Sequence, residues 1–204
     1  MMAVAEYFVP SRKEDPKVKA ALYEKDVYAG MRADYISNHV GYPLYYEDSS
    51  KYYGRIEDLY EQYLKDLQDA KQFIFLEYFI LERGKMFDKI LEILEEKAKA
   101  GVVVRIIYDD MGCVKTLPSK FVNEMKEKGI SCIRFNPFRP MMAVIMNNRD
   151  HRKITVIDGK IAYTGGFNLA DEYINEVELY GHWKDAGLRL TGSCVWNFTT
   201  MFLE

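Results

Sequence analysis

This chain is poor in the residues that build disulfide frameworks, zinc sites and histidine-based catalytic centres. Its 204 residues contain three histidines and three cysteines, and the cysteines are odd in number with no Cys-x-x-Cys spacing. They are therefore expected to be reduced thiols of a cytosolic domain, not disulfides or zinc ligands. Any reaction that needs an imidazole must use one of only three positions.

The sequence also lacks a membrane span and an excess of basic residues. No apolar run reaches the roughly 18 residues that span a bilayer, and the N-terminus lacks the basic-then-apolar order of a signal peptide. The net charge is −3 and the pI about 5.8, whereas proteins that bind duplex nucleic acid usually carry a basic excess. With 49% apolar and 29% charged residues, the composition predicts a soluble globular domain, and no nucleic-acid partner is expected.

Both ends of the sequence suggest a domain cut from a longer chain. It begins with a doubled methionine and a polar, lysine-rich lead, and it ends in an amphipathic helical pattern over 195–203 that has no cap. Residues 1–50 carry many tyrosines and few clean periods, and 1–40 are left as a poorly assigned N-terminal lead. One folded domain is expected over 41–204.

Helical and strand patterns alternate three times after Gly54. Apolar residues at helical spacing predict helices over 55–72, 86–101 and 118–129, and short apolar runs predict strands over 73–80, 102–108 and 130–135. Such alternation predicts an α/β domain whose mixed central sheet contains parallel pairs and is flanked by helices on both faces.

A hairpin is predicted where Asp158-Gly159 separates two apolar runs, because both residues tolerate the positive φ of a two-residue turn. Such a turn would place Lys153 opposite Thr164 and His151 opposite Gly166. Side chains alternate along a strand, so the imidazole and the ammonium should share one face at the open end of the hairpin.

An anion pocket is predicted at that open end. Gly165 and Gly166 allow the backbone to approach a ligand closely. The amide of Asn168 can donate two hydrogen bonds, and the sequence after it looks like a helix start, whose backbone N–H groups attract anions. With Lys153 beside it, His151 is then a candidate nucleophile or proton carrier.

An acid should orient the imidazole of His151 by accepting its Nδ1–H. Asp158 lies about 23 Å away along a strand that rises about 3.3 Å per residue, so we assign it to the turn. Asp185, just before the last strand, is the candidate, unless it forms a surface ion pair with Arg189. The weaker alternatives are Asp109, Asp110, Glu77 and Glu172.

Lys153 stands two places after His151, Asp158 follows after four more residues, and a Gly-Gly-x-Asn segment ends at Asn168. This spacing resembles the HKD signature of the phospholipase D superfamily. The segments "FIFLEYFI", "GVVVRIIYDDMG" and "GHWKDAGLRLTG" look like the N-terminal half of bacterial cardiolipin synthases, from about Gly41 onward. The usual signature ends Gly-Ser-x-Asn. Gly166 therefore lacks one hydroxyl contact to phosphate.

The resemblance implies a phospholipase D-like fold and a two-step phosphatidyl transfer without metal or cofactor. His151 would form a phosphohistidine, Lys153 and Asn168 would bind phosphate oxygens beside Gly165 and Gly166, and Asp185 would orient His151. The implied substrate is phosphatidylglycerol and the products are cardiolipin and glycerol. The implied location is the cytoplasmic side of the cell membrane, which the full-length protein would contact.

The sequence departs from the family in carrying one motif, because neither His39 nor His182 has a lysine two places on. An alkoxide leaving group needs a proton that the attacking histidine cannot give in the same step. A second histidine is expected from a missing C-terminal half or from a second copy of the chain. A single-motif phosphodiesterase or nuclease active as a homodimer is the alternative, and we expect the isolated chain to fold but be inactive or only partly active.

Overall fold

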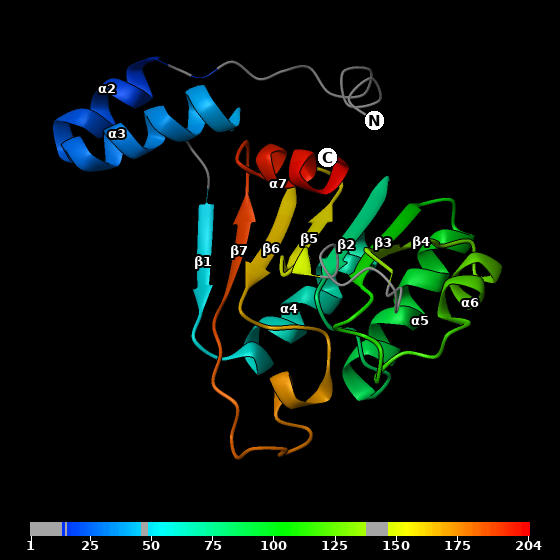
Figure 1. Ribbon diagram of the computed structural model, residues 1–204. Coiled ribbons are helices and arrows are strands. Elements are labelled where there is room, and N and C mark those ends of the chain that lie inside the picture. The colour runs from blue at the N-terminus through cyan, green and yellow to red at the C-terminus, as the bar shows by residue number, and fades with distance from the viewer. Residues whose placement is uncertain (1–13, 15, 46–48, 138–146) are drawn as a thin grey trace.

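The computed structural model describes residues 14, 16–45, 49–137 and 147–204, and they form one seven-stranded mixed sheet (Figure 1). The order is β1-β7-β6-β5-β2-β3-β4. The strands are β1 (Ser49–Tyr53), β2 (Phe73–Tyr78), β3 (Val103–Asp109), β4 (Ser131–Phe135), β5 (Ile154–Ile157), β6 (Ile161–Gly165) and β7 (Gly187–Thr191). β2, β3 and β4 run parallel to one another, and every other neighbouring pair is antiparallel.

Helices cover both faces of this sheet, as the sequence predicted. On one face lie α4 (Ile56–Asp69), α5 (Lys85–Lys99) and α6 (Phe121–Glu127), and on the other α7 (Val195–Leu203) packs against β5 and β6 (Figure 1). The predicted glycine stops are present: Gly101 and Gly129 follow α5 and α6 with φ of 89° and 76°, where a side chain would be strained.

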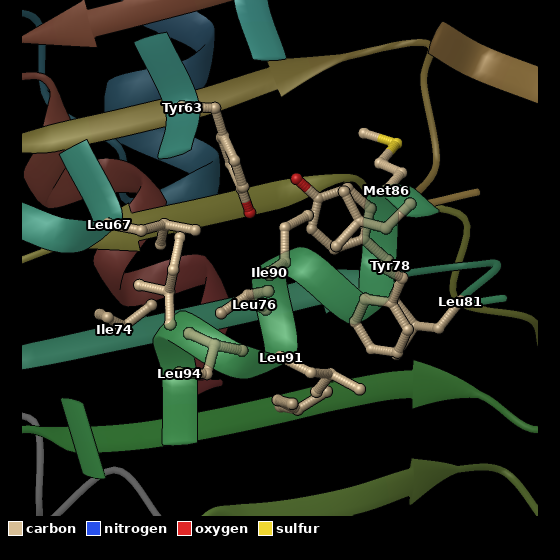
Figure 2. Close-up of a cluster of buried hydrophobic side chains, with 14 of the residues drawn as sticks. Tyr63, Leu67, Ile74, Leu76, Tyr78, Leu81, Met86, Ile90, Leu91 and Leu94 are labelled. Atoms are coloured by element: carbon tan, nitrogen blue, oxygen red, sulfur yellow. The ribbon is translucent and has the colours of Figure 1, made fainter. Parts of the chain in front are cut away.

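The larger core lies between the sheet and the helices α4 to α6. Figure 2 shows side chains of α4 and α5, among them Leu67 and Ile90, meeting Ile74, Leu76 and Tyr78 of β2. A smaller cluster under α7 buries the opposite face of β5. All four residues of β5 are therefore buried, which fixes the backbone that leads back to His151.

The region assigned only as a lead is largely helical where it is described. It forms α2 (Pro16–Lys25), α3 (Val27–Tyr35) and a π-helix, η1 (Ile36–Val40). The segment after η1 meets α7, where Asn197 Nδ2 donates to Pro43 O at 3.1 Å and Tyr42 OH donates to Glu204 Oε2 at 2.8 Å. Across the described ranges, no helix combines the length and apolar character that a bilayer span needs.

The predicted hairpin forms, but its register is wrong by one residue. Ile157 pairs with Ile161 instead of Lys160, and Ile154 takes the place opposite Thr164 that was predicted for Lys153. Lys160 is an extra loop residue after the two left-handed positions, Asp158 at φ 53° and Gly159 at φ 63°. The ladder begins at Ile154, so the predicted pairs of Lys153 and His151 do not form.

Contacts from outside the hairpin hold the longer loop in place. The Asp158 carboxylate accepts the backbone N–H groups of Lys71, Gln72 and Phe73 at 2.7 to 2.8 Å. Its own N–H donates to Phe73 O at 2.9 Å. A charged acceptor of three N–H groups is a strong local anchor, and it joins the hairpin to the start of β2.

Candidate functional site

The sheet brings separate segments together at one edge. The parallel strands β2 and β3 end there, and β5, which runs antiparallel to β2, begins there with Ile154 paired to Glu77. β6 ends at the same edge, where Gly165 pairs with Gly187 at the start of β7. The carboxyl ends of parallel strands are a usual place for ligand sites in α/β sheets.

His151 and Lys153 meet around Phe79, which follows β2. The His151 ring is exposed and lies against Phe79 with the ring centroids 4.7 Å apart. Lys153 is only 6% exposed. Its Nζ donates to His151 O at 2.9 Å and lies 5.5 Å from the Phe79 centroid, within range of a cation–π contact.

The buried ammonium is an electrostatic feature of this edge. Burial lowers the pKa of Lys153, while the carboxylates of Asp150 and Asp185 act in the opposite direction. A desolvated cation gains from an anion placed beside it, so Lys153 can bind a negatively charged group more strongly than a solvated lysine can.

Asn168 is 3% exposed and already oriented. Its Oδ1 accepts the N–H of Ile80 at 3.0 Å, and its Nδ2 donates to Tyr173 OH at 2.7 Å. One of the two amide hydrogens expected for a ligand is therefore used within the protein. The helix start predicted after Asn168 is a four-residue 3₁₀ turn, η3 (Asp171–Ile174), too short to give the helix N-terminus that we expected.

Gly165 and Gly166 allow a close approach between the end of β6 and the chain before β7. A Cβ on Gly165 would lie 2.9 Å from Gly187 Cα, and one on Gly166 would lie 2.8 Å from Cγ of Asp185 and nearer still to its Oδ1. Neither glycine has a positive φ. Contact distance therefore explains them: Gly165 faces backbone atoms that cannot move aside, whereas at Gly166 the neighbour is the Asp185 side chain. Gly166 places the Asp185 carboxylate directly against the Gly-Gly-x-Asn segment.

Asp185 is half-buried, and its Oδ1 accepts the N–H of Ala186 at 2.7 Å. It influences both Lys153 and Tyr173 electrostatically. Arg189 does not support the alternative surface pair, because its Nε lies 2.6 Å from the buried Asp66. The structure therefore brings Asp185 to the same edge as His151 and Lys153.

The weaker candidate Asp109 has a different set of contacts. Its carboxylate accepts N–H groups from Asp150 and Gly112 at 3.0 Å each and lies 3.2 Å from Arg149 Nη1. It holds the chain that leads into His151. Asp110, the next residue, is paired with Arg134 at 3.8 Å.

Glu77 forms part of a buried acidic pair that was not anticipated. It is fully buried in β2, with Arg152 Nη2 2.6 Å from its Oε1. Arg152 Nε also lies 3.3 Å from Oδ1 of Asp150, which is 5% exposed. Burial and then the neighbouring Asp150 raise the pKa of Glu77 to about 8, against the effect of Arg152.

Glu77, Asp150 and Arg152 lie on the side of the His151 segment that faces α7, away from Phe79. Arg152 Nη1 donates to Met201 O of α7 at 2.9 Å, whereas Lys153 contacts Phe79. A charged residue inside the apolar run "FIFLEYFI" was the signal in the sequence for Glu77. Phe79 and Tyr173 had no such signal, because ordinary core packing also explains an aromatic residue.

The assembled groups are an exposed imidazole, a buried ammonium, an amide with one remaining hydrogen and a half-buried carboxylate. Together they can hold a phosphoryl oxygen near a nucleophile. Among the residues whose placement is described, no group of three or more His, Cys, Asp or Glu could hold a metal ion.

Comparison with known sequences gives the family. The family described as "Cardiolipin synthase, PLD-like domain" matches residues 63–179, which include His151, Lys153 and Asn168 but end before Asp185. An uncharacterized protein of Streptococcus mutans serotype c is 40% identical over 202 residues, 99% of this chain and 43% of that protein. Cardiolipin synthase 2 of Staphylococcus epidermidis is 39% identical over 137 residues, 67% of this chain and 28% of that protein. The chain therefore spans less than half the length of either relative.

A solved structure agrees on the fold. Nuc, a phospholipase D family member from Salmonella typhimurium, superposes with a TM-score of 0.56 at 18% identity, over 77% of this chain and 93% of that chain. The seven-stranded sheet flanked by helices is thus the phospholipase D fold. The family match over residues 63–179, more than half of the chain, shows that the chain belongs to the cardiolipin synthase, PLD-like domain family.

Proposed function

We propose that this chain is the nucleophile-bearing part of a phosphatidyltransferase. The observation that carries the proposal is the meeting of His151 and Lys153 around Phe79, with Asn168 buried at the same edge. An imidazole next to a buried ammonium suits attack on a phosphodiester, because negative charge grows on the phosphoryl oxygens as the new bond forms.

In the first step a nitrogen of His151 attacks phosphorus, and the bond to the leaving alkoxide breaks. Lys153 and the remaining hydrogen of Asn168 Nδ2 bind the phosphoryl oxygens. Asp185 accepts the other ring N–H of His151 and favours the positively charged imidazole. In the second step an alcohol attacks the phosphohistidine, giving the new phosphodiester and restoring the imidazole.

The leaving alkoxide needs a proton, which a second histidine would give and later take from the incoming alcohol. Relatives more than twice as long as this chain favour a source elsewhere in a longer protein. A second candidate function, a single-motif phosphodiesterase acting as a homodimer, is favoured by the fit to 93% of the Nuc chain. The net charge of −3 does not favour a nucleic acid as the substrate of such a dimer.

The proposed substrate is phosphatidylglycerol, whose phosphatidyl group would pass to a second phosphatidylglycerol to give cardiolipin and glycerol. The name of the relative that is 39% identical supports this choice. Because the substrate is part of a bilayer, the protein would act at a membrane surface, and we place it on the cytoplasmic side.

An activated ester tests the first step without the second histidine. In bis(4-nitrophenyl) phosphate the leaving phenolate departs without protonation, so the chain alone should release up to one equivalent and retain an aryl phosphate on His151. Peptide mass spectrometry after alkaline quenching locates the adduct, and EDTA should leave it unchanged. His151→Ala should abolish both signals, whereas His39→Ala, an exposed histidine on η1, should keep them. An adduct on another residue would refute the proposed nucleophile.

A further inference from the structure

The hydrogen bonds of Asn168 determine what the neighbouring Tyr173 hydroxyl can do. The N–H of Ile80 can only donate, so the amide oxygen of Asn168 must face it, at 3.0 Å. The amide nitrogen then faces Tyr173 and donates to its hydroxyl oxygen at 2.7 Å. Since Tyr173 oxygen accepts this bond, its own O–H proton must point elsewhere.

The phenol is buried against an aromatic neighbour, and its pKa is raised. Tyr173 is 6% exposed, and its ring lies against Trp183 with the centroids 4.9 Å apart. Burial, followed by the nearby carboxylates of Glu172 and Asp185, raises its pKa, although the bond from Asn168 acts in the opposite direction. Within the part of the chain that the structure describes, no acceptor takes the O–H proton of Tyr173.

The Gly-Gly-x-Asn segment, 165–168, has no hydroxyl to offer. Gly166 has no side chain, so it offers no donor, and a Cβ there would meet the Asp185 carboxylate. A phosphoryl group bound by Lys153 and Asn168 would carry unshared oxygens on the side of Tyr173. A neutral phenol with an available proton is a suitable donor to such an oxygen.

We propose that Tyr173 is a substrate-binding residue of this site, and that its O–H donates to a phosphoryl oxygen that Lys153 and Asn168 also hold. The inference rests on the proposed phosphate site and adds one donor to it. The competing explanation is that Tyr173 only accepts from Asn168 and keeps the amide in place.

Binding of inorganic phosphate to the 204-residue chain tests the donor. Trp183, in contact with Tyr173, gives a fluorescence signal for the titration, and amide NMR shifts locate the bound ion. Tyr173→Phe should weaken binding about tenfold, as expected for loss of one hydrogen bond to a charged group. The matched control is Tyr60→Phe, which removes a hydroxyl bonded to Met86 O at 3.0 Å and should bind phosphate like the unmodified chain.

Replacing Tyr173 with 3-fluorotyrosine separates the two explanations by the sign of the effect. The fluorinated phenol is a stronger hydrogen-bond donor and a weaker acceptor, so a donating O–H predicts tighter phosphate binding. A hydroxyl that only accepts from Asn168 predicts unchanged or weaker binding, which would overturn the inference, as would Tyr173→Phe with unaltered affinity. If the unmodified chain binds no phosphate at this edge, the proposed site itself fails.

Discussion

The buried Glu77 gives the structure a pH dependence that one substitution should remove. Its carboxyl is fully buried in β2, and its pKa of about 8 compares with an ordinary value of 4.5. Burial is the main cause, and the second carboxyl, of Asp150, adds to it. Glu77→Gln keeps the size of the side chain and removes its titration.

The direction of this pH dependence follows from the pKa values of Glu77 in the folded and the unfolded chain. Below about pH 4.5 Glu77 is protonated in both states. Between there and about pH 8 the unfolded chain releases the proton while the folded chain retains it, so the free energy of unfolding falls as pH rises. The full difference corresponds to at most about 5 kcal/mol, reduced by any relaxation that lets water reach the carboxyl.

Urea denaturation followed by circular dichroism, from pH 5 to 9, measures this directly. The stability of Glu77→Gln relative to the unmodified chain should rise steadily from pH 5 to 8, because only the unmodified chain loses the contribution. Glu92→Gln, on the surface of α5 with its carboxylate 2.9 Å from Lys89 Nζ, is the control and should follow the unmodified chain. Parallel pH profiles for Glu77→Gln and the unmodified chain would refute the reasoning.

Three further predictions follow from single contacts. Asp158→Asn should lower the free energy of unfolding by about 2 to 3 kcal/mol in urea, because one amide oxygen replaces a carboxylate that accepts three N–H groups; normal stability with lost adduct formation would contradict its assignment to the turn. Lys153→Met should keep the fold by circular dichroism yet lose phosphate binding at least tenfold in the fluorescence titration, and retained affinity would remove the ammonium from the site. Gly166→Ala should slow adduct formation on His151, since the added methyl displaces the Asp185 carboxylate; an unchanged rate would separate that carboxylate from catalysis.

The helices and strands that could be predicted from the sequence are those whose buried apolar residues recur at a regular spacing. The helices α4 and α5 and the strands β2 and β3 form close to the expected positions, because their apolar residues recur at the period of the element that buries them. β1 was missed because it lacks such a period. It is an edge strand in which only Tyr53 is buried, so no alternation marks it.

Features set by contacts between distant residues were not predictable from local patterns. The hairpin register depends on Asp158 binding N–H groups more than 80 positions away, which no turn rule contains. The contacts of Asn168 with Ile80 and of Arg152 with Glu77 depend in the same way on the order of strands in the sheet. Residue types at the site were thus readable from the motif, whereas their partners required the fold.

The central claim is that a phosphoryl group binds between His151, Lys153 and Asn168. A crystal of the chain soaked with orthovanadate tests it most directly, because vanadate bonds to a histidine nitrogen in the geometry of phosphoryl transfer. We predict vanadium bonded to His151, with its oxygens in hydrogen-bond distance of Lys153 Nζ and Asn168 Nδ2. Vanadate bonded to another residue would contradict the account. So would an ordered site that stays empty at a vanadate concentration high enough to saturate it.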